Sequence, residues 1–193
     1  MSGAAVVLAG GLSERMGRPK ALLGLGTSNF LGTILARLEP LGLPWTAVVT
    51  NPRVPLAIAG PRILINRDPQ RGQLSSLRLA LEAGARDFPW LLVALVDQPV
   101  VGAATYRALV DATAEPAAMW VPVYGGRRGH PLVFDRCCYE DLLAAPDEEG
   151  MRWVVARHRD RRREVPVDDP EIHRDVDTPE DYEALLGRVG SKE

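Results

Sequence analysis

The chain has 193 residues, of which 46% are hydrophobic and 25% are charged, values typical of a folded soluble protein with a buried core. Its 23 Lys and Arg against 25 Asp and Glu give a formal net charge of -2, which excludes a general electrostatic attraction to nucleic acid or to an anionic membrane. The adjacent Cys137 and Cys138 predict no disulfide framework, and we expect no signal peptide or membrane span, because the apolar segment Val6–Ala9 is too short for either. We therefore expect a single cytoplasmic domain over residues 1–193.

Three short apolar runs in the first half of the chain are typical of strands buried on both faces. Ala4–Ala9 is partly β-branched and ends at two glycines, and Trp45–Thr50 and Trp90–Val96 end at turn-forming or acidic residues. Between these runs, apolar residues recur at helical spacing in Asn29–Leu41 and in Leu74–Ala85. These two segments are predicted to be crossover helices.

This alternation of strands and helices predicts an α/β fold with three αβα layers around a Rossmann-like, open and mostly parallel sheet. Ligands of such sheets bind at the carboxyl ends of the strands. After Asp97 the pattern changes to a helix at Ala103–Ala112, a strand at Met119–Tyr124, a glycine-rich turn and a strand at Pro131–Phe134. A mixed sheet with an antiparallel strand accommodates this order.

The last third of the chain is predicted to be mainly helical. Tyr139–Ala144 and Gly150–His158 are predicted to be two short helices. A final helix is expected at Glu180–Leu186, with Pro179 as its first residue and Thr178 as its cap.

A glycine-rich, cationic loop follows the first predicted strand. Glycines at the end of a parallel strand expose backbone N–H groups that can converge on an anion. Arg15 offers a planar fork of donors to phosphate oxygens, and Lys20 offers a mobile point charge. The spacing fits neither the P-loop nor the dinucleotide fingerprint, so a structural turn with solvated charges is an equal alternative on spacing alone.

The loop "LAGGLSERMGRPKALL" at Leu8–Leu23 resembles the signature loop of nucleotidyltransferases of the MobA-like family, which includes the molybdenum cofactor cytidylyl- and guanylyltransferases. The resemblance implies a nucleotide-diphospho-sugar transferase-like fold. It also implies that Arg15 and Lys20 bind phosphate during catalysis. The residues that it places at the nucleotide are Leu8, Ala9, Gly10 and Gly11.

Two carboxylates are candidates for a metal site, since Mg²⁺ prefers oxygen ligands and accompanies triphosphates. Asp97 directly follows "WLLVALV", and "VDQP" resembles the metal-binding segment of the family. Asp177 lies in "RDVDTPEDY", which resembles the family motif "DIDTPED", with Asp175 as a weaker substrate-binding candidate. The alternatives are a helix cap for Asp177 and a turn before Pro99 for Asp97.

The segment "RGQLSSLRLAL" at Arg71–Leu81 resembles the family segment beside the nucleotide base and ribose, in its cytidylyltransferase form. The resemblance implies that Gln73, Ser75 and Ser76 bind the nucleotide. A helix N-terminus with a serine cap is the structural alternative. Both roles are compatible, because a helix N-terminus also favours an anion.

The segment "GGRRGHPLVF" at Gly125–Phe134 resembles a family loop on the acceptor side, which implies that Arg127, Arg128 and His130 meet a second anionic substrate. A hairpin turn with two solvated arginines is the alternative.

Two further segments lie between the acceptor-side loop and the last predicted helix. "DEEGMRWVV" at Asp147–Val155 resembles the cytidylyltransferase branch. The run Arg157–Arg163 is interpreted as a solvated helix end or turn. His158 and His173 have no partners at metal spacing, so neither they nor the cysteines are assigned any chemistry.

The resemblance implies Mg²⁺-dependent transfer of a nucleoside monophosphate from CTP to a phosphorylated acceptor, molybdopterin, with release of pyrophosphate. "LAGG" is the guanylyltransferase form of the loop, so GTP is an alternative donor. Sugar phosphates or methylerythritol phosphate are alternative acceptors. Two alternative functions come from other classes of protein. One is an NAD(P)H-dependent oxidoreductase, and the other is a non-catalytic module that delivers the cofactor to a molybdoenzyme or its chaperone.

Overall fold

The computed structural model describes residues 2–56 and 58–190. The strands in that part of the chain are β1 Ala4–Leu8, β2 Gly24–Leu25, β3 Ser28–Asn29, β4 Trp45–Thr50, β5 Arg62–Ile65, β6 Trp90–Leu95, β7 Met119–Tyr124, β8 Arg127–Arg128, β9 Leu132–Asp135 and β10 Arg162–Pro166. The α-helices there are α1 Phe30–Leu38, α2 Gln73–Glu82, α3 Ala103–Ala112, α4 Tyr139–Ala144, α5 Met151–Arg157 and α6 Pro179–Gly190.

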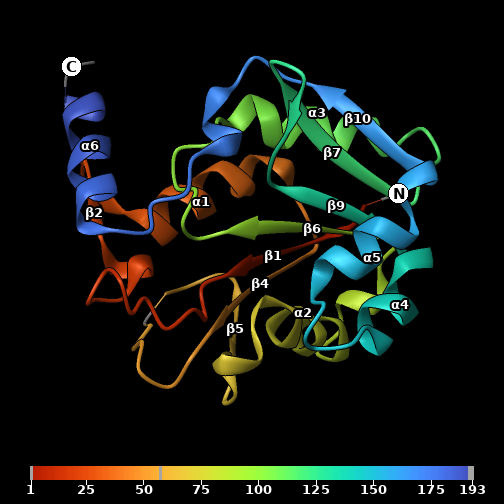
Figure 1. Cartoon of the computed structure of the whole chain (residues 1–193), viewed down its shortest axis with the longest axis horizontal. Coiled ribbons are helices and arrows are strands. Elements are labelled where there is room, and N and C mark those ends of the chain that lie inside the picture. Colours follow the sequence, from red (N-terminus) through yellow and green to blue (C-terminus); the bar gives the residue numbers. More distant parts are fainter. Residues whose placement is uncertain (1, 57, 191–193) are drawn as a thin grey trace.

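A mixed eight-stranded sheet runs through the molecule in the order β10-β7-β9-β6-β1-β4-β5, with β8 paired to β7 (Figure 1). β1 pairs in parallel with β4 and β6, and β5 pairs in parallel with β4. β9 lies antiparallel between β6 and β7. The α/β prediction of a mostly parallel sheet with an antiparallel strand is therefore confirmed.

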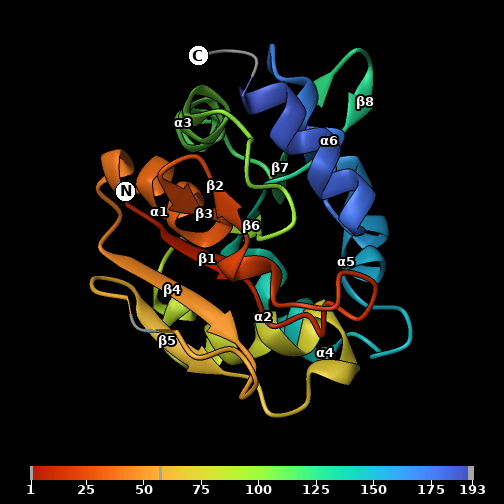
Figure 2. The same ribbon diagram turned by 90° about the vertical axis from the view of Figure 1, so that its left-hand side faces the viewer.

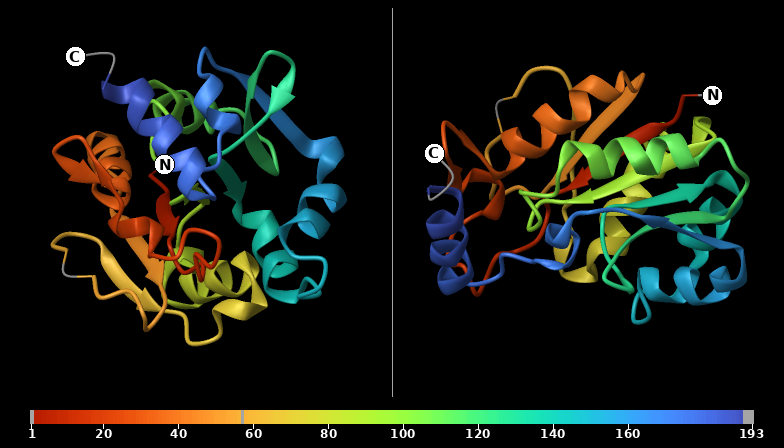
Figure 3. Two further views of the ribbon diagram at one scale, coloured as in Figure 1. Left: turned by 60° about the vertical axis from the view of Figure 1, so that its left-hand side comes forward. Right: turned by 90° about the horizontal axis from the view of Figure 1, so that it is seen from above.

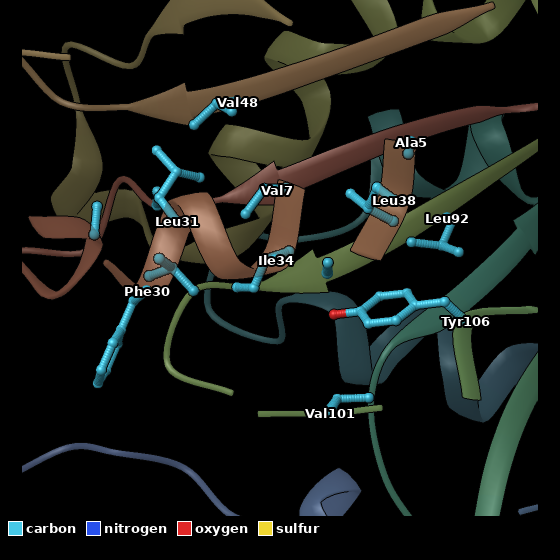
Figure 4. Packing of buried hydrophobic residues seen from close by; sticks show 14 of the residues in the cluster. Ala5, Val7, Phe30, Leu31, Ile34, Leu38, Val48, Leu92, Val101 and Tyr106 are labelled. Atoms are coloured by element: carbon cyan, nitrogen blue, oxygen red, sulfur yellow. The ribbon is translucent and has the colours of Figure 1, made fainter. Parts of the chain in front are cut away.

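Helices cover both faces of the sheet, which explains why β1 is apolar throughout. Successive side chains of a strand point to opposite faces, and all five β1 residues are buried. Val7 packs with α1 and α3, whereas Val6 packs with α2, α4 and α5. Figure 2 shows α1 and α3 on one side of β1, and α2 and α4 on the other. Figure 4 shows the first of these faces, where Leu31 of α1 lies toward Val48 of β4 and Ile34 of α1 lies toward Val7 of β1.

Two edge strands were not expected from the sequence. β5 carries no fully buried residue, and in β10 only Val165 is buried. Neither strand therefore has the apolar run that marks a buried strand. The interpretation of 157–163 as a helix end or turn is wrong for Arg162 and Arg163, because both pair with β7.

The two crossover helices are shorter than predicted. α1 begins after Asn29, whose side chain accepts a hydrogen bond from Gly32 N (2.8 Å), and a 3-10 turn at Glu39–Leu41 follows it. α2 ends at Glu82, because Gly84 has φ 127, a backbone conformation outside the helical region.

The start of α6 agrees with the expected cap. Asp181 N donates to Thr178 Oγ1 (3.2 Å), and Thr178 N donates to Asp181 Oδ2 (2.9 Å). The helix begins at Pro179 and continues beyond the predicted end at Leu186. Among the described residues, no helix combines the length and apolar character that a bilayer crossing requires.

Gly129 is required by a close approach between two segments. A Cβ at this position would lie 2.2 Å from Ile172 O, and His130 N donates to that same carbonyl (3.0 Å).

We expect Gly129→Ala to destabilise the protein by about 1–3 kcal/mol, because the added methyl must displace the backbone of Ile172. Thermal unfolding would measure this. Gly126→Asn is the control, since Gly126 has φ 75 and open space around it, and Asn tolerates that conformation. An equal loss of stability in both variants would contradict this account.

Candidate functional site

Three segments that are far apart in sequence converge at the carboxyl ends of β1 and β6. The loop after β1, Asp97 after β6 and Asp177 before α6 line one cavity of about 410 Å³. Val96 N donates to Leu8 O (3.2 Å), and Val176 N donates to Asp97 O (2.8 Å), so backbone hydrogen bonds hold the segments together. Figure 3 shows the loop between the start of α6 and α2.

The glycine-rich loop has a defined internal structure. Ser13 adopts φ 52, and its carbonyl accepts hydrogen bonds from Met16 N (3.1 Å) and Gly17 N (2.9 Å). Lys20 N donates to Ser13 Oγ (3.3 Å). A non-glycine residue in the left-handed region is uncommon, so Ser13 marks a turn that returns the chain toward the cavity and positions Lys20.

Asn51, at the end of β4, orients the two loop glycines. Its Nδ2 donates to Gly10 O (3.1 Å) and Gly11 O (3.3 Å), and the residue is 2% exposed. In a planar trans peptide, the N–H points opposite to the carbonyl. The N–H groups of Gly11 and Leu12 therefore point away from Asn51. Sequence reasoning missed this residue, although a polar side chain directly after a buried parallel strand is a usable signal for it.

Both loop cations contact the carboxylates. Lys20 Nζ donates a short hydrogen bond to Asp177 Oδ1 and lies 3.6 Å from Asp97 Oδ2. Arg15 donates to Asp177 Oδ2 (2.7 Å). The lysine side chain is 12% exposed, whereas that of Arg15 is 69% exposed. Lys20 is consequently the inner cation of the site and Arg15 the outer one.

The two carboxylates have opposite pKa shifts. Burial raises the pKa of Asp97, and the nearby Lys20 opposes that shift. The hydrogen bond from Lys20 is the main cause that lowers the pKa of Asp177, and Arg15 adds to it. A further positive charge close to Asp97 would therefore stabilise its ionised carboxylate.

The donor set fits a hard divalent cation. Asp97 Oδ1 is buried and has no hydrogen-bond partner among the described residues. A buried acceptor without a partner is costly, and oxygen ligands of this kind are those that Mg²⁺ prefers. Lys20 lies against both Asp97 and Asp177, so a cation in its place would meet both carboxylates.

Asp177 is not needed as the cap of α6. The carboxylate of Asp181 accepts from Asp177 N (3.1 Å), Thr178 N and Thr178 Oγ1. Thr178 and Asp181 therefore satisfy the helix start between them. This leaves the Asp177 side chain for Lys20 and Arg15, and it removes the capping alternative for this residue.

The structure brings most of the expected nucleotide residues to the cavity. Those that line it are Leu8, Ala9, Gly10, Gly11, Arg15, Lys20, Gln73, Ser76, Asp97 and Asp177. Ser75 is absent from this lining, since its hydroxyl donates to Gly72 O (2.8 Å). Asp175 is also absent and accepts instead from Gln98 Nε2 (2.8 Å).

Two of the three expected acceptor-side residues line a second, adjoining cavity, whereas Arg127 is absent from its lining. Arg128 and His130 both face it, and it shares Gly72 and Gln73 with the first cavity. Arg162 of β10 also lines it, which the sequence analysis missed because it placed this residue in a solvated run. Burial lowers the pKa of His130, so its imidazole favours the neutral form.

Two arginines join α2 and the turn before it to the loop before α5. Arg78 NH1 donates to Asp147 Oδ1 (2.5 Å), and Arg71 Nε donates to Asp147 Oδ2 (2.8 Å). Arg78 also donates to the main chain at the end of α4, to Leu142 O (3.1 Å) and to Ala145 O. The two segments that resemble the cytidylyltransferase branch are therefore linked directly.

The cysteines and His158 do come together, unlike the sequence expectation that His158 lacks partners. Ligand atoms of Cys137, Cys138 and His158 lie within 4.8 Å of one another. However, Cys138 donates its thiol to Ala118 O (3.1 Å), burial raises the pKa of both thiols, and the His158 ring bonds Asp141 (2.7 Å). Cys138 and His158 thus already have hydrogen-bond partners within the protein, so we assign no metal to this group.

Residues 5–162 match the MobA-like NTP transferase domain. The chain belongs to this family. A MobA-like NTP transferase is a nucleotidyltransferase, so the chain is an enzyme, and the cavity with its cations and carboxylates is its candidate active site. The match covers the loop, Asp97 and the second cavity's Arg128 and His130, but it ends before Asp177.

Curated relatives of this MobA-like chain carry three different names. The molybdenum cofactor guanylyltransferase of Rhizobium meliloti (strain 1021) is 30% identical, over 84% of this chain and 78% of the relative. The nicotine blue oxidoreductase of Paenarthrobacter nicotinovorans is 28% identical, over 94% and 95% of the two chains. The molybdenum cofactor cytidylyltransferase of Escherichia coli (strain K12) is 24% identical, over 92% of each chain.

Solved structures support the same assignment. Rv0371c from Mycobacterium tuberculosis H37Rv aligns with a TM-score of 0.85 and 31% identity, covering 97% of this chain and 99% of the other. A complex of Rv0371c with manganese aligns with a TM-score of 0.80 and 29% identity, over the same shares of the two chains. The MobA-like fold is therefore matched over nearly the whole length.

Proposed function

We propose that this nucleotidyltransferase transfers a cytidylyl group from CTP to a phosphorylated acceptor, molybdopterin, and releases pyrophosphate in a Mg²⁺-dependent reaction. The observation that carries the proposal is the convergence of Lys20 and Arg15 with Asp97 and Asp177 in one cavity. Cations that bind phosphate and carboxylates that bind a divalent ion are the two requirements of phosphoryl-group chemistry on a triphosphate.

The triphosphate would lie at the end of the cavity that holds the cations. Lys20 and Arg15 release Asp177 and turn to phosphate oxygens, and the N–H groups of Gly11 and Leu12 add donors that carry no net charge. An acceptor oxygen then attacks the α-phosphorus in line, and pyrophosphate leaves. The protein acts by positioning the reactants and stabilising the charge that builds up.

Asp97 and Asp177 would hold the Mg²⁺, which supplies charge neutralisation at the phosphates when bound. The buried Asp97 Oδ1 without a partner supports this assignment. A manganese complex of the related Rv0371c is a further argument for a divalent ion at this family's site.

The acceptor would enter through the second cavity. Arg128, Arg162 and His130 line it, and the shared Gly72 and Gln73 lie between it and the nucleotide. An acceptor held there has a short path to the α-phosphorus. A phosphate nucleophile is ionised near neutral pH, so the reaction needs no general base, in agreement with the neutral form of His130 that burial favours.

CTP is the proposed donor because of the segments beside the base. Residues 71–81 and 147–155 have the cytidylyltransferase form, and Arg71 and Arg78 bind them together through Asp147. The Escherichia coli cytidylyltransferase aligns over 92% of this chain. GTP is the second candidate, favoured by the "LAGG" loop and by the Rhizobium meliloti guanylyltransferase.

Gly10→Ala, which converts "LAGG" to "LAAG", is expected to shift the enzyme further toward CTP. The new Cβ would lie 3.3 Å from Ser76 Oγ and 3.6 Å from Thr50 C, which narrows the cavity beside the base. One methyl group in a pocket discriminates by roughly tenfold or more, so the ratio of kcat/KM for CTP over GTP should rise on that scale. Gly11→Ala is the control, because nothing lies within 4 Å of its Cβ position.

Pyrophosphate release in the presence of molybdopterin and each NTP tests the proposed function. The expected result is turnover that requires Mg²⁺ and molybdopterin and is fastest with CTP. Release with a sugar phosphate or methylerythritol phosphate instead would reassign the acceptor. Consumption of NADPH without Mg²⁺ would favour an oxidoreductase, which is the activity named for the Paenarthrobacter nicotinovorans relative.

A further inference from the structure

Two buried asparagines occupy equivalent places at the ends of neighbouring parallel strands. Asn51 follows β4 and Asn66 follows β5, and Asn66 N donates to Thr50 O (2.7 Å), which continues the β4–β5 pairing. Both residues are nearly inaccessible, with 2% and 6% exposure. Asn51 holds the glycine loop, whereas Asn66 faces the start of α2.

The orientation of the Asn66 amide is fixed by its own backbone. Its Oδ1 accepts from Asp68 N (2.9 Å), the same two-residue turn by which Asn51 Oδ1 accepts from Arg53 N (2.9 Å). Because only the oxygen can accept from an N–H group, the amide nitrogen of Asn66 must point toward α2.

The nitrogen of Asn66 therefore donates to two serine hydroxyls at once. Its Nδ2 lies 2.8 Å from Ser75 Oγ and 2.9 Å from Ser76 Oγ. A hydroxyl that accepts in this way must direct its own hydrogen elsewhere. Ser75 donates its hydrogen to Gly72 O (2.8 Å). Ser76, by contrast, lines the nucleotide cavity, so the cavity is where its hydrogen can be donated.

Ser76 lies on α2 and lines the nucleotide cavity beside the glycine loop. Its Oγ is 3.3 Å from the position of a Cβ on Gly10. The lining residues next to Ser76 in the sequence, Pro69, Gln70 and Gln73, are uncharged, whereas Arg15 and Lys20 contact Asp177. In the proposed function residues 71–81 lie beside the base, so Ser76 is assigned to the base and the two cations to the phosphates.

We infer that Asn66 is a positioning residue that forces the Ser76 hydroxyl to act as a hydrogen-bond donor to the base, and so selects bases with a carbonyl oxygen. The inference rests on the proposed function and adds a rule for the donor nucleotide. Cytosine and guanine each carry a ring carbonyl that can accept this hydrogen, whereas adenine carries none. CTP and GTP are thereby favoured over ATP, and Asn66 acts only through Ser76.

Titration calorimetry of the full chain with CTP, GTP and ATP in Mg²⁺ tests this inference, using Asn66→Ala, Ser76→Ala and the double variant. Each single variant should weaken CTP and GTP binding on the order of fivefold, the value of one hydrogen bond, and leave ATP binding unchanged. The double variant should bind CTP no more weakly than Ser76→Ala alone, because the two residues act in one chain of hydrogen bonds. Additive losses, or equal losses for all three nucleotides, would overturn the inference.

Asn66→Asp keeps the inference testable where Asn66→Ala does not fold. The carboxylate introduced in this variant still accepts from Asp68 N, but it can only accept, so both serine hydroxyls must donate to it. Its negative charge should weaken the binding of CTP, GTP and ATP alike. The ratio of CTP to ATP affinity should still fall on the order of fivefold, and an unchanged ratio would contradict the inference. Asn29→Ala is a matched control, because it removes the part-buried asparagine that caps the N-terminus of α1. This variant should lower the unfolding temperature but leave the ratio of CTP to ATP affinity unchanged.

Binding and turnover separate this inference from the proposed function. Wild-type protein that prefers CTP or GTP over ATP but releases no pyrophosphate with any acceptor would overturn the proposed function alone. Turnover with ATP at the same kcat/KM as with CTP would overturn the inference alone. Wild-type protein that binds no nucleotide would overturn both.

Discussion

Asp97→Asn is expected to lower the rate of pyrophosphate release by about 10²–10³-fold, the usual cost of removing one preorganised electrostatic group from an active site. The amide keeps the shape of the side chain but loses the negative charge at the buried Oδ1, which has no hydrogen-bond partner among the described residues. The loss should appear mainly in kcat, because the triphosphate is bound by cations elsewhere in the cavity. Steady-state kinetics at saturating Mg²⁺ would measure it.

The stability of the same variant provides the control. Burial raises the pKa of Asp97, so the folded state bears a cost for its charge at neutral pH. Asp97→Asn should consequently unfold at the same temperature as the wild type or at a higher one. A strong loss of activity together with a lower unfolding temperature would indicate a structural role, and wild-type turnover would exclude Asp97 from the metal site.

Lys20→Met is expected to have two opposite effects. Turnover should fall by about 10²-fold, because the inner cation of the triphosphate site is lost. Binding of Mn²⁺ to the nucleotide-free protein should become tighter, since Lys20 Nζ no longer lies between Asp97 and Asp177. Electron paramagnetic resonance of free Mn²⁺ would measure the second effect without any turnover.

Arg18→Met is the matched control for the lysine variant. Arg18 is a cation of the same loop, but its guanidinium lies 5.2 Å from the centre of the Tyr182 ring rather than at the carboxylates. It should therefore leave Mn²⁺ affinity unchanged. Weaker Mn²⁺ binding in Lys20→Met would show that the lysine helps to hold the ion site open instead of competing for it.

Residue type alone was sufficient to predict the central strands, whereas Asp97 and Asp177 became metal candidates through their resemblance to family motifs. β1, β4 and β6 are apolar on both faces because helices cover both sides of the sheet. Asp97 was found because it follows the most apolar of these runs, where the carboxyl edge of the sheet must lie. The edge strands β5 and β10 gave no such signal, since pairing with one neighbour and not burial holds them in place.

The direction of polar side chains was beyond the reach of sequence patterns. Asn51 and Asn66 each follow a strand, but which groups their amides contact depends on the register of β4 with β5 and on turns two residues long. Similarly, Ser75 and Ser76 are adjacent and chemically identical, yet only Ser76 lines the nucleotide cavity. The helical rotation between neighbouring residues separates them.

The sequence by itself determined the α/β class and the cationic glycine loop, because these follow from burial and from the charge of individual residues. Only the tertiary structure decided that Lys20 bridges Asp97 and Asp177, that Thr178 and Asp181 free Asp177 from capping, and that Arg162 reaches the second cavity. The physical reason is that a hydrogen bond or ion pair forms or fails with changes of a few tenths of an ångström in the donor–acceptor distance. The residues that make these contacts are up to 162 positions apart, so the packed fold sets their distances.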